Sequence, residues 1–188
     1  RDTDAGVART AYQPLLTYRD QPEIAAQLLI SLRKEGTSQV DAGYLALFTV
    51  LASSSLPQSS EALLRTFDEN VGAHPSRWTR LTNMLEGLAA EGGEPSLAAL
   101  QVFRQSQPFQ LDFGFRRAVV QAAIALRTPE SVSQLIEWLE FLDGETRGDV
   151  IRYLTVLARQ DHGLDVKAWQ TWWKEHQQGF EFPAVAAI

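Results

Sequence analysis

The chain has 188 residues, of which 45% are hydrophobic and 21% charged, a composition that predicts a folded domain and excludes extensive disorder. The formal charge is −6, basic residues form no cluster, and no apolar run reaches about 18 residues, so neither nucleic acid nor membrane insertion is expected. There are no cysteines, which excludes disulfides, thiolate metal sites and cysteine nucleophiles.

The first half of the chain predicts helices from apolar residues at helical spacing. The stripes lie within Ile24–Leu32, Val40–Leu51, Leu63–Val71 and Trp78–Ala89. Pro22 fits the first helical position before the first stripe, and Ser76 is the expected N-cap before the last. The serine-rich stretch Ser53–Gln58 is expected to be a loop.

The second half continues the pattern, with stripes within Leu97–Phe103, Val119–Leu126, Val132–Leu142, Val150–Leu157 and Trp169–Trp173. Thr128, Pro129 and Glu130 form a helix-start signature of cap, first-turn proline and acid at the positive end of the dipole. Asp165 is expected to cap the last helix, and Ser106–Leu111 to be a loop. No alternating run predicts a strand, so we expect an all-α fold of about ten helices.

The middle of the chain repeats at a shift of 35 residues, which places apolar residues on apolar residues from Met84 on Val119 to Phe103 on Trp138. A shift of 30 residues places Ile124 on Leu154. A period of roughly 30–40 residues with two helices per unit is the signature of a helical solenoid. We therefore expect a single domain over residues 1–188, built of antiparallel helix pairs stacked as an α-α superhelix and clearest over residues 76–160. An ordinary non-repeating helical bundle is the alternative.

The repeat lacks the anchors of tetratricopeptide and ankyrin units. Its apolar spacing, with a proline or arginine near helix starts, resembles HEAT-like repeats over residues 76–160. Leu157–Trp173 reads LARQDHGLDVKAWQTWW and resembles the closing segment of HEAT-repeat proteins from planctomycete-like bacteria, in which a Leu-Thr-Gly-Gln-Asp-Phe-Gly turn precedes an Asp-x-x-x-Trp-x-x-Trp-Trp helix. Here Ala158-Arg159 replaces Thr-Gly, and His162 replaces Phe.

This resemblance implies the end of an array and an exported or periplasmic protein, and it implies no reaction. The chain starts at Arg1 and not at Met, so a processed or truncated piece is expected, with any export signal outside it.

Trp169, Trp172 and Trp173 share one face of the helix predicted over residues 165–177, because they fall at i, i+3 and i+4. In a capping helix these indoles would cover the open end of the last helix pair, and residues 178–188 would follow as an extended tail. The alternative is an aromatic platform for a sugar or a cation. Three large rings so close together are expected to leave an exposed indole edge under either interpretation.

Asp161, His162 and Asp165 lie within one predicted turn, where a metal site would need converging ligands. Helix capping by Asp165 and bonding of turn amides by Asp161 is the preferred interpretation. The three histidines form no His-Glu-x-x-His array, and the chain has no Gly-x-Ser-x-Gly elbow or glycine-rich phosphate loop. We therefore predict no catalytic residue, no metal site and no cofactor.

Arg80, Arg116, Arg117 and Arg147 recur near the starts of alternate predicted helices. If the repeat holds, they form a ladder along one edge of the array. Hydrogen bonds and ion pairs that tie adjacent loops together are the structural interpretation of this ladder. An edge that binds an anion or a partner protein is the functional one.

The repeat period and the missing catalytic motifs predict a non-enzymatic scaffold that binds another protein through a concave face or an edge. The first alternative is a small-ligand-binding or lyase-type helical domain with a cleft between helix pairs, in which His162 or His176 would be the first residues to check. The second alternative is a capping fragment of a larger protein.

Overall fold

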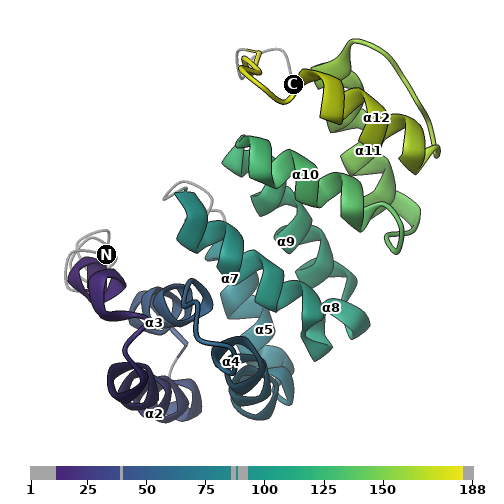
Figure 1. Ribbon diagram of the computed structural model, residues 1–188. Helices are drawn as coiled ribbons and strands as arrows, with labels where there is room; N and C mark the ends of the chain where they lie inside the picture. The colour runs from purple at the N-terminus through teal and green to yellow at the C-terminus, as the bar shows by residue number, and fades with distance from the viewer. Residues whose placement is uncertain (1–11, 39, 86–87, 89–92, 184–188) are drawn as a thin grey trace. The chain divides into compact units, whose positions relative to one another are not determined.

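The computed structural model describes residues 12–38, 40–85, 88 and 93–183 (Figure 1). Of the stripe predicted within Trp78–Ala89, only residues 86, 87 and 89 lie outside these ranges, and its described part is a helix that ends at Thr82, followed by a turn at Asn83 and Met84, so the single helix predicted there is interrupted. Residues 184–188 of the predicted tail also lie outside the described ranges. Every regular element in the described ranges is helical and no strand is present there, so the all-α prediction is confirmed. None of these described helices is long and apolar enough to cross a membrane.

The chain divides into two compact units, Arg1–Val119 and Val120–Ile188, and the boundary falls inside helix α9 (Phe113–Leu126). The sequence predicts one domain over residues 1–188, and its continuous helical periodicity contains no sign of this division. The stacking of helix pairs as a superhelix stays a prediction.

Besides the first part of α9, the described helices of the first unit are η1 (Gln13–Tyr18), α2 (Pro22–Ser38), α3 (Ala42–Ala52), α4 (Ser59–Phe67), the π-helical turn η2 (Asp68–Gly72), α5 (Pro75–Thr82), α7 (Gly93–Gln105) and α8 (Gln107–Leu111). Helix α3 is buried on nearly every side and packs against α2, α4 and α7. Its sequence is apolar almost throughout, as expected for a helix inside a core.

A cluster of four buried phenylalanines forms the centre of the first unit. Phe48 of α3 stacks on Phe103 of α7, with ring centroids 4.2 Å apart. Phe67 of α4 lies 5.3 Å from Phe103, and Phe115 of α9 meets the same ring edge-on at 5.9 Å. One aromatic ring from α7 therefore ties together three other helices of this unit, and edge-on and offset pairs are the favourable geometries for such rings.

Two further local predictions in the first unit are wrong. Residues Ser106–Leu111, expected to be a loop, contain helix α8, because Pro108 near its start pre-sets a helical φ and Phe109 is buried. Ser76, expected to be an N-cap, lies inside α5, since Pro75 occupies the start of that helix and His74 precedes it. The loop predicted over Ser53–Gln58 is confirmed as a stretch without helix.

The second unit contains the end of α9 and three further described helices, α10 (Pro129–Trp138), α11 (Gly144–Ala158) and α12 (Val166–His176). Helix α10 starts as predicted at Thr128, whose hydroxyl accepts from the Ser131 N–H while the Ser131 hydroxyl accepts from the Thr128 N–H. Arg127 and Arg159, which directly follow α9 and α11, have φ values of 50° and 54°. This left-handed conformation is common just after a helix end.

Candidate functional sites

The three indoles of α12 are buried inside the second unit. Trp169, Trp172 and Trp173 are 0%, 8% and 4% exposed, so these three indoles do not present the exposed edge predicted from the sequence and form no platform facing solvent. The N–H of Trp169 donates to the Gly163 carbonyl at 3.0 Å, and the N–H of Trp173 donates to the Ser133 hydroxyl at 2.8 Å. These bonds satisfy the N–H groups of Trp169 and Trp173, whose rings pack as core side chains.

The burial is completed by the chain that follows α12, which folds back over the indoles. Phe180 lies 6.0 Å from the Trp172 ring and 5.1 Å from the Trp173 ring, edge-on to both. Phe182 packs on Phe180 at 5.2 Å, and the Arg127 guanidinium lies over the Phe182 ring while it donates to the Pro183 carbonyl. The described part of the predicted tail, residues 178–183, is therefore packed onto the unit.

The two histidines of the second unit belong to the same cluster. The His162 ring meets Trp169 edge-on at 4.7 Å, and the His176 ring stacks on Trp172 at 5.8 Å. His176 Nδ1 lies 2.7 Å from the Trp172 carbonyl oxygen. Neither histidine lines either of the two grooves described below.

Two aspartates in the turn before α12 stabilise it by accepting hydrogen bonds from backbone N–H groups. The Asp161 carboxylate accepts from the Gly163 N–H at 2.7 Å, and Asp165 accepts from the Ala168 N–H at 3.0 Å. This is the capping interpretation favoured from the sequence. Within the described ranges, no three His, Cys, Asp or Glu side chains are placed to hold a metal ion together.

The four arginines predicted to form an edge differ in their surroundings. Arg80 and Arg117 are exposed on α5 and α9. Arg116 donates from Nε to the Phe109 carbonyl and from a terminal nitrogen to the Gln110 carbonyl, both at 2.9 Å, so its fork fastens α8 to α9. Arg147 belongs to the second unit, where it is half-buried near the start of α11. The common edge of Arg80, Arg116, Arg117 and Arg147 stays a prediction.

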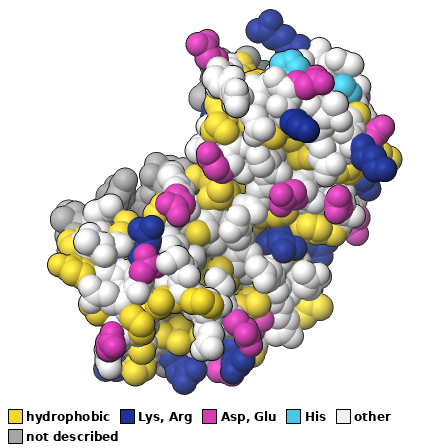
Figure 2. Space-filling view, in the orientation of Figure 1, with side chains coloured by type: hydrophobic (Ala, Val, Ile, Leu, Met, Phe, Trp, Pro, Cys, Tyr) yellow, Lys and Arg dark blue, Asp and Glu magenta, His cyan; other side chains and the backbone are white. Residues whose placement is uncertain are grey.

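The first unit contains an apolar groove that sequence reasoning missed, here called the α2–α4 groove. Its volume is about 360 Å³. It is lined by Pro22, Ala25, Ala26 and Leu29 of α2, Leu51 of α3, Leu56, Pro57 and Gln58 of the connection into α4, and Ser59 at the start of α4. Hydrophobic side chains gather over the α2 and α4 region in Figure 2. The α2 members follow a spacing of i, i+3, i+4 and i+7, so one stripe of the helix forms one wall.

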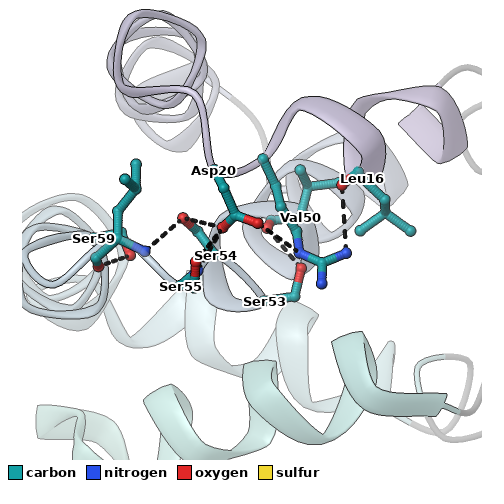
Figure 3. Close-up of polar contacts among 9 residues, drawn as sticks. Leu16, Asp20, Val50, Ser53, Ser54, Ser55 and Ser59 are labelled. Atoms are coloured by element: carbon teal, nitrogen blue, oxygen red, sulfur yellow. Dashed lines mark hydrogen bonds and ion pairs between the residues drawn. The ribbon is translucent and has the colours of Figure 1, made fainter.

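A polar clamp joins the two walls of the α2–α4 groove. The Asp20 carboxylate, just before α2, accepts from the Ser55 N–H at 2.6 Å, the Ser55 hydroxyl at 2.9 Å and the Ser54 hydroxyl at 3.3 Å (Figure 3). The Ser55 bonds, with smaller contributions from Arg19 and Ser54, hold the pKa of Asp20 below its ordinary value of 3.8. The clamp fixes the loop that carries Leu56 and Pro57, and so the groove is shaped before any ligand arrives.

The second unit contains a more polar groove, here called the α9–α11 groove, with a volume of about 490 Å³. It is lined by Gln121 and Ile124 of α9, Asp149, Ile151, Arg152, Tyr153, Thr155 and Val156 of α11, and Asp161. The Asp149 carboxylate is buried and accepts from the Gln121 amide at 2.9 Å and from the Arg152 guanidinium. A buried carboxylate thus holds two polar side chains at the groove.

One sequence signal could have pointed to the α9–α11 groove. Asp149 lies three residues after Thr146 and four before Tyr153, on the stripe of α11 that faces the core. An acid at such a position must find hydrogen-bond donors, because an unpaired charge is costly to bury. The α2–α4 groove had no equivalent signal, since its lining residues are the ordinary apolar residues of a helix and a loop.

No known protein family, curated protein or solved structure compared with the chain matches it. The resemblance to HEAT-like repeats therefore stays a prediction that rests on the quoted residues.

Proposed function

We propose that the chain is a non-enzymatic protein-interaction module whose α2–α4 groove binds an apolar segment of a partner protein. The observation that carries the proposal is the groove itself: seven of its nine lining residues are apolar, and it opens on the surface of α2. Further along the same helix, Ile30 is 62% exposed. Concave apolar sites edged by a few polar groups are the usual form of binding pockets.

The size and chemistry of the groove favour a partner that inserts one or two aliphatic or aromatic side chains. Gln58 and Ser59 are the two polar residues of the lining, and the other lining residues, Leu51 and Leu56 among them, are apolar. Because the Asp20 clamp holds the walls together in advance, little ordering entropy is lost on binding. Anchors that fill such a pocket usually dominate the affinity of an interface.

A selection from a random peptide display library, with the full chain as bait, tests the proposal. Peptides that share apolar anchors are expected, and the Ala26→Arg variant should weaken their binding at least about tenfold, because a charged side chain would enter the groove. Gln27→Arg is the matched control, since it adds the same charge at the next, exposed position of α2, which does not line the groove. Peptides that bind the Ala26→Arg variant and the parent chain equally would contradict the proposal.

The small-ligand alternative is favoured by one observation, the polar side chains of Gln121, Asp149 and Arg152 that converge at the α9–α11 groove. Converging polar groups in a cavity are the feature that distinguishes such a domain from a purely apolar docking surface.

A further inference from the structure

The geometry of the α9–α11 groove points to a second binding site, in the second unit, for the uncharged peptide groups of an extended chain segment that also carries an aliphatic side chain. This site is separate from the α2–α4 groove and does not depend on it. The inference starts from Asp149, whose side chain is 5% exposed while that of Arg152 is 74% exposed. A buried carboxylate therefore orients a guanidinium that remains open to solvent.

The hydrogen bonds to Asp149 decide which groups are offered to a ligand. A carboxylate only accepts, so the Gln121 side chain must turn its NH₂ toward Asp149, as the 2.9 Å bond from Nε2 to Oδ2 records. The amide oxygen of Gln121 is then left as an acceptor. The Arg152 guanidinium uses one terminal nitrogen on Asp149 Oδ1, and among the described residues this is its only hydrogen bond, so its other N–H groups remain donors.

A fixed donor beside a fixed acceptor matches a peptide group, which carries one carbonyl and one N–H. A carbonyl of the ligand would accept from Arg152, and an N–H of the ligand would donate to Gln121. Because Asp149 holds both side chains, their geometry is established before the ligand binds, which reduces the entropy lost on association.

The remaining lining residues select against charged ligands and for an aliphatic side chain. Asp149 and Asp161 carry two negative charges against the single positive charge of Arg152, so the lining has a net charge of −1 and disfavours an anion. A cation gains little from Asp149, which is already engaged by Gln121 and Arg152. Ile124, Ile151 and Val156 supply the apolar wall on which a side chain next to the bound peptide group can pack.

A titration of the isotopically labelled full chain, followed by nuclear magnetic resonance, tests the inference with three matched tripeptides. The probes are N-acetyl-Ala-Leu-Ala amide, the same peptide with a free carboxylate, and the same peptide with a free amino group. We expect the uncharged probe to shift the side-chain N–H signals of Gln121 and Arg152 saturably and to bind about tenfold more tightly than the two charged probes.

Variants separate recognition from general apolar binding. Arg152→Met keeps the aliphatic stem and removes the donors, and it should weaken the uncharged probe about tenfold, whereas Lys174→Met, an exposed cation of α12 outside the groove, should leave binding unchanged. Asp149→Asn keeps the side-chain size and removes the charge that orients Arg152, so it should weaken binding although Arg152 is still present. Chemical shifts elsewhere in the second unit report whether each variant is folded.

Three outcomes would overturn the inference: no saturable shift at Gln121 and Arg152, equal affinity for all three probes, or tighter binding of a charged probe. The first would mean that the groove binds no peptide group, the second that it does not discriminate against charged ligands, and the third would assign it to an anion or a cation. Loss of peptide selection at the α2–α4 groove would leave this result untouched, because the two grooves belong to different units.

Discussion

The indole N–H of Trp173 donates a 2.8 Å hydrogen bond to the hydroxyl of Ser133, which joins α12 to α10. The same hydroxyl donates to the Pro129 carbonyl at 3.1 Å, so one oxygen serves two partners.

Ser133→Ala leaves a buried N–H unpaired, and we expect it to lower the free energy of unfolding by about 1–3 kcal/mol. Chemical denaturation followed by circular dichroism measures this loss. The exposed Thr171→Ala variant of α12 is the control, and an equal effect of the two substitutions would show that the bond contributes nothing.

Removal of the Phe180 ring tests the packing of the segment after α12. Phe180→Ala takes away a half-buried ring that contacts Trp172 and Trp173, and we expect a loss of about 2 kcal/mol, since the same change at a fully buried site costs about 3–5 kcal/mol. Hydrogen exchange should also become faster in α12 than elsewhere in the unit. Glu181→Ala, at an exposed neighbour, should leave both quantities unchanged. Unaltered stability of Phe180→Ala would mean that the segment only rests on the surface.

The buried Tyr153 hydroxyl has no hydrogen-bond partner among the described residues. Tyr153→Phe removes this unpaired polar group, so we expect the free energy of unfolding at neutral pH to stay equal or to rise. Urea denaturation of the two chains provides the comparison. A loss above about 1 kcal/mol would show that the hydroxyl is paired in solution, because a net hydrogen bond contributes that much.

The raised pKa of Tyr153 predicts that the free energy of unfolding depends on pH in the alkaline range. Burial raises the pKa of Tyr153 from 10.0 to about 12, against a smaller opposing contribution from Arg127. Above pH 10.0 the tyrosine of the unfolded chain loses the proton that the folded chain retains. The contribution of protonated Tyr153 to the free energy of unfolding is therefore complete below pH 10.0 and is lost as the pH rises toward about 12. The free energy of unfolding should therefore fall more steeply in this window for the parent chain than for Tyr153→Phe, by at most about 1.4 kcal/mol per pH unit. Parallel profiles would refute the burial of the hydroxyl.

The clamp at Asp20 predicts a change at acidic pH. Its pKa is lowered mainly by the Ser55 hydrogen bonds, so the clamp is complete above the ordinary aspartate value of 3.8 and is lost as the pH falls through the lower folded value. The Ser55 amide resonance should titrate in that window below pH 3.8. Asp20→Ala should abolish the titration and speed exchange of the Ser55 amide at neutral pH, whereas Glu23→Ala, in the first turn of α2, should change neither. A titration that persists in Asp20→Ala would assign it to another carboxylate.

Much of the fold could be predicted from the sequence because its signals are local. Helix positions follow from apolar spacing, and the start of α10 follows from Thr128 and Pro129, whose effects act within one turn. The failures at Ser76 and at residues 106–111 were also local, because Pro75 and Pro108 start helices where a serine cap or a loop was expected.

The candidate sites could not be predicted in the same way because they depend on contacts between distant residues. Asp20 and Ser55 are separated by 35 positions, and Gln121 and Asp149 by 28, without any periodicity that links them. The prediction of an exposed indole edge on α12 was wrong for the same reason. Phe180 lies in a stretch with no helical pattern, so nothing in the spacing of the sequence indicated that it would cover Trp172 and Trp173.

The tryptophans are distributed unevenly between the two units, so intrinsic tryptophan fluorescence can distinguish the unfolding of one unit from that of the other. Four of the five, Trp138, Trp169, Trp172 and Trp173, belong to the second unit, and Trp78 alone belongs to the first. Selective excitation of indole fluorescence therefore reports mainly the unfolding of residues 120–188, whereas the far-ultraviolet signal of the helices reports both units. Coincident transitions by the two signals would show that the chain unfolds as one cooperative block, and separated transitions would give each unit its own stability.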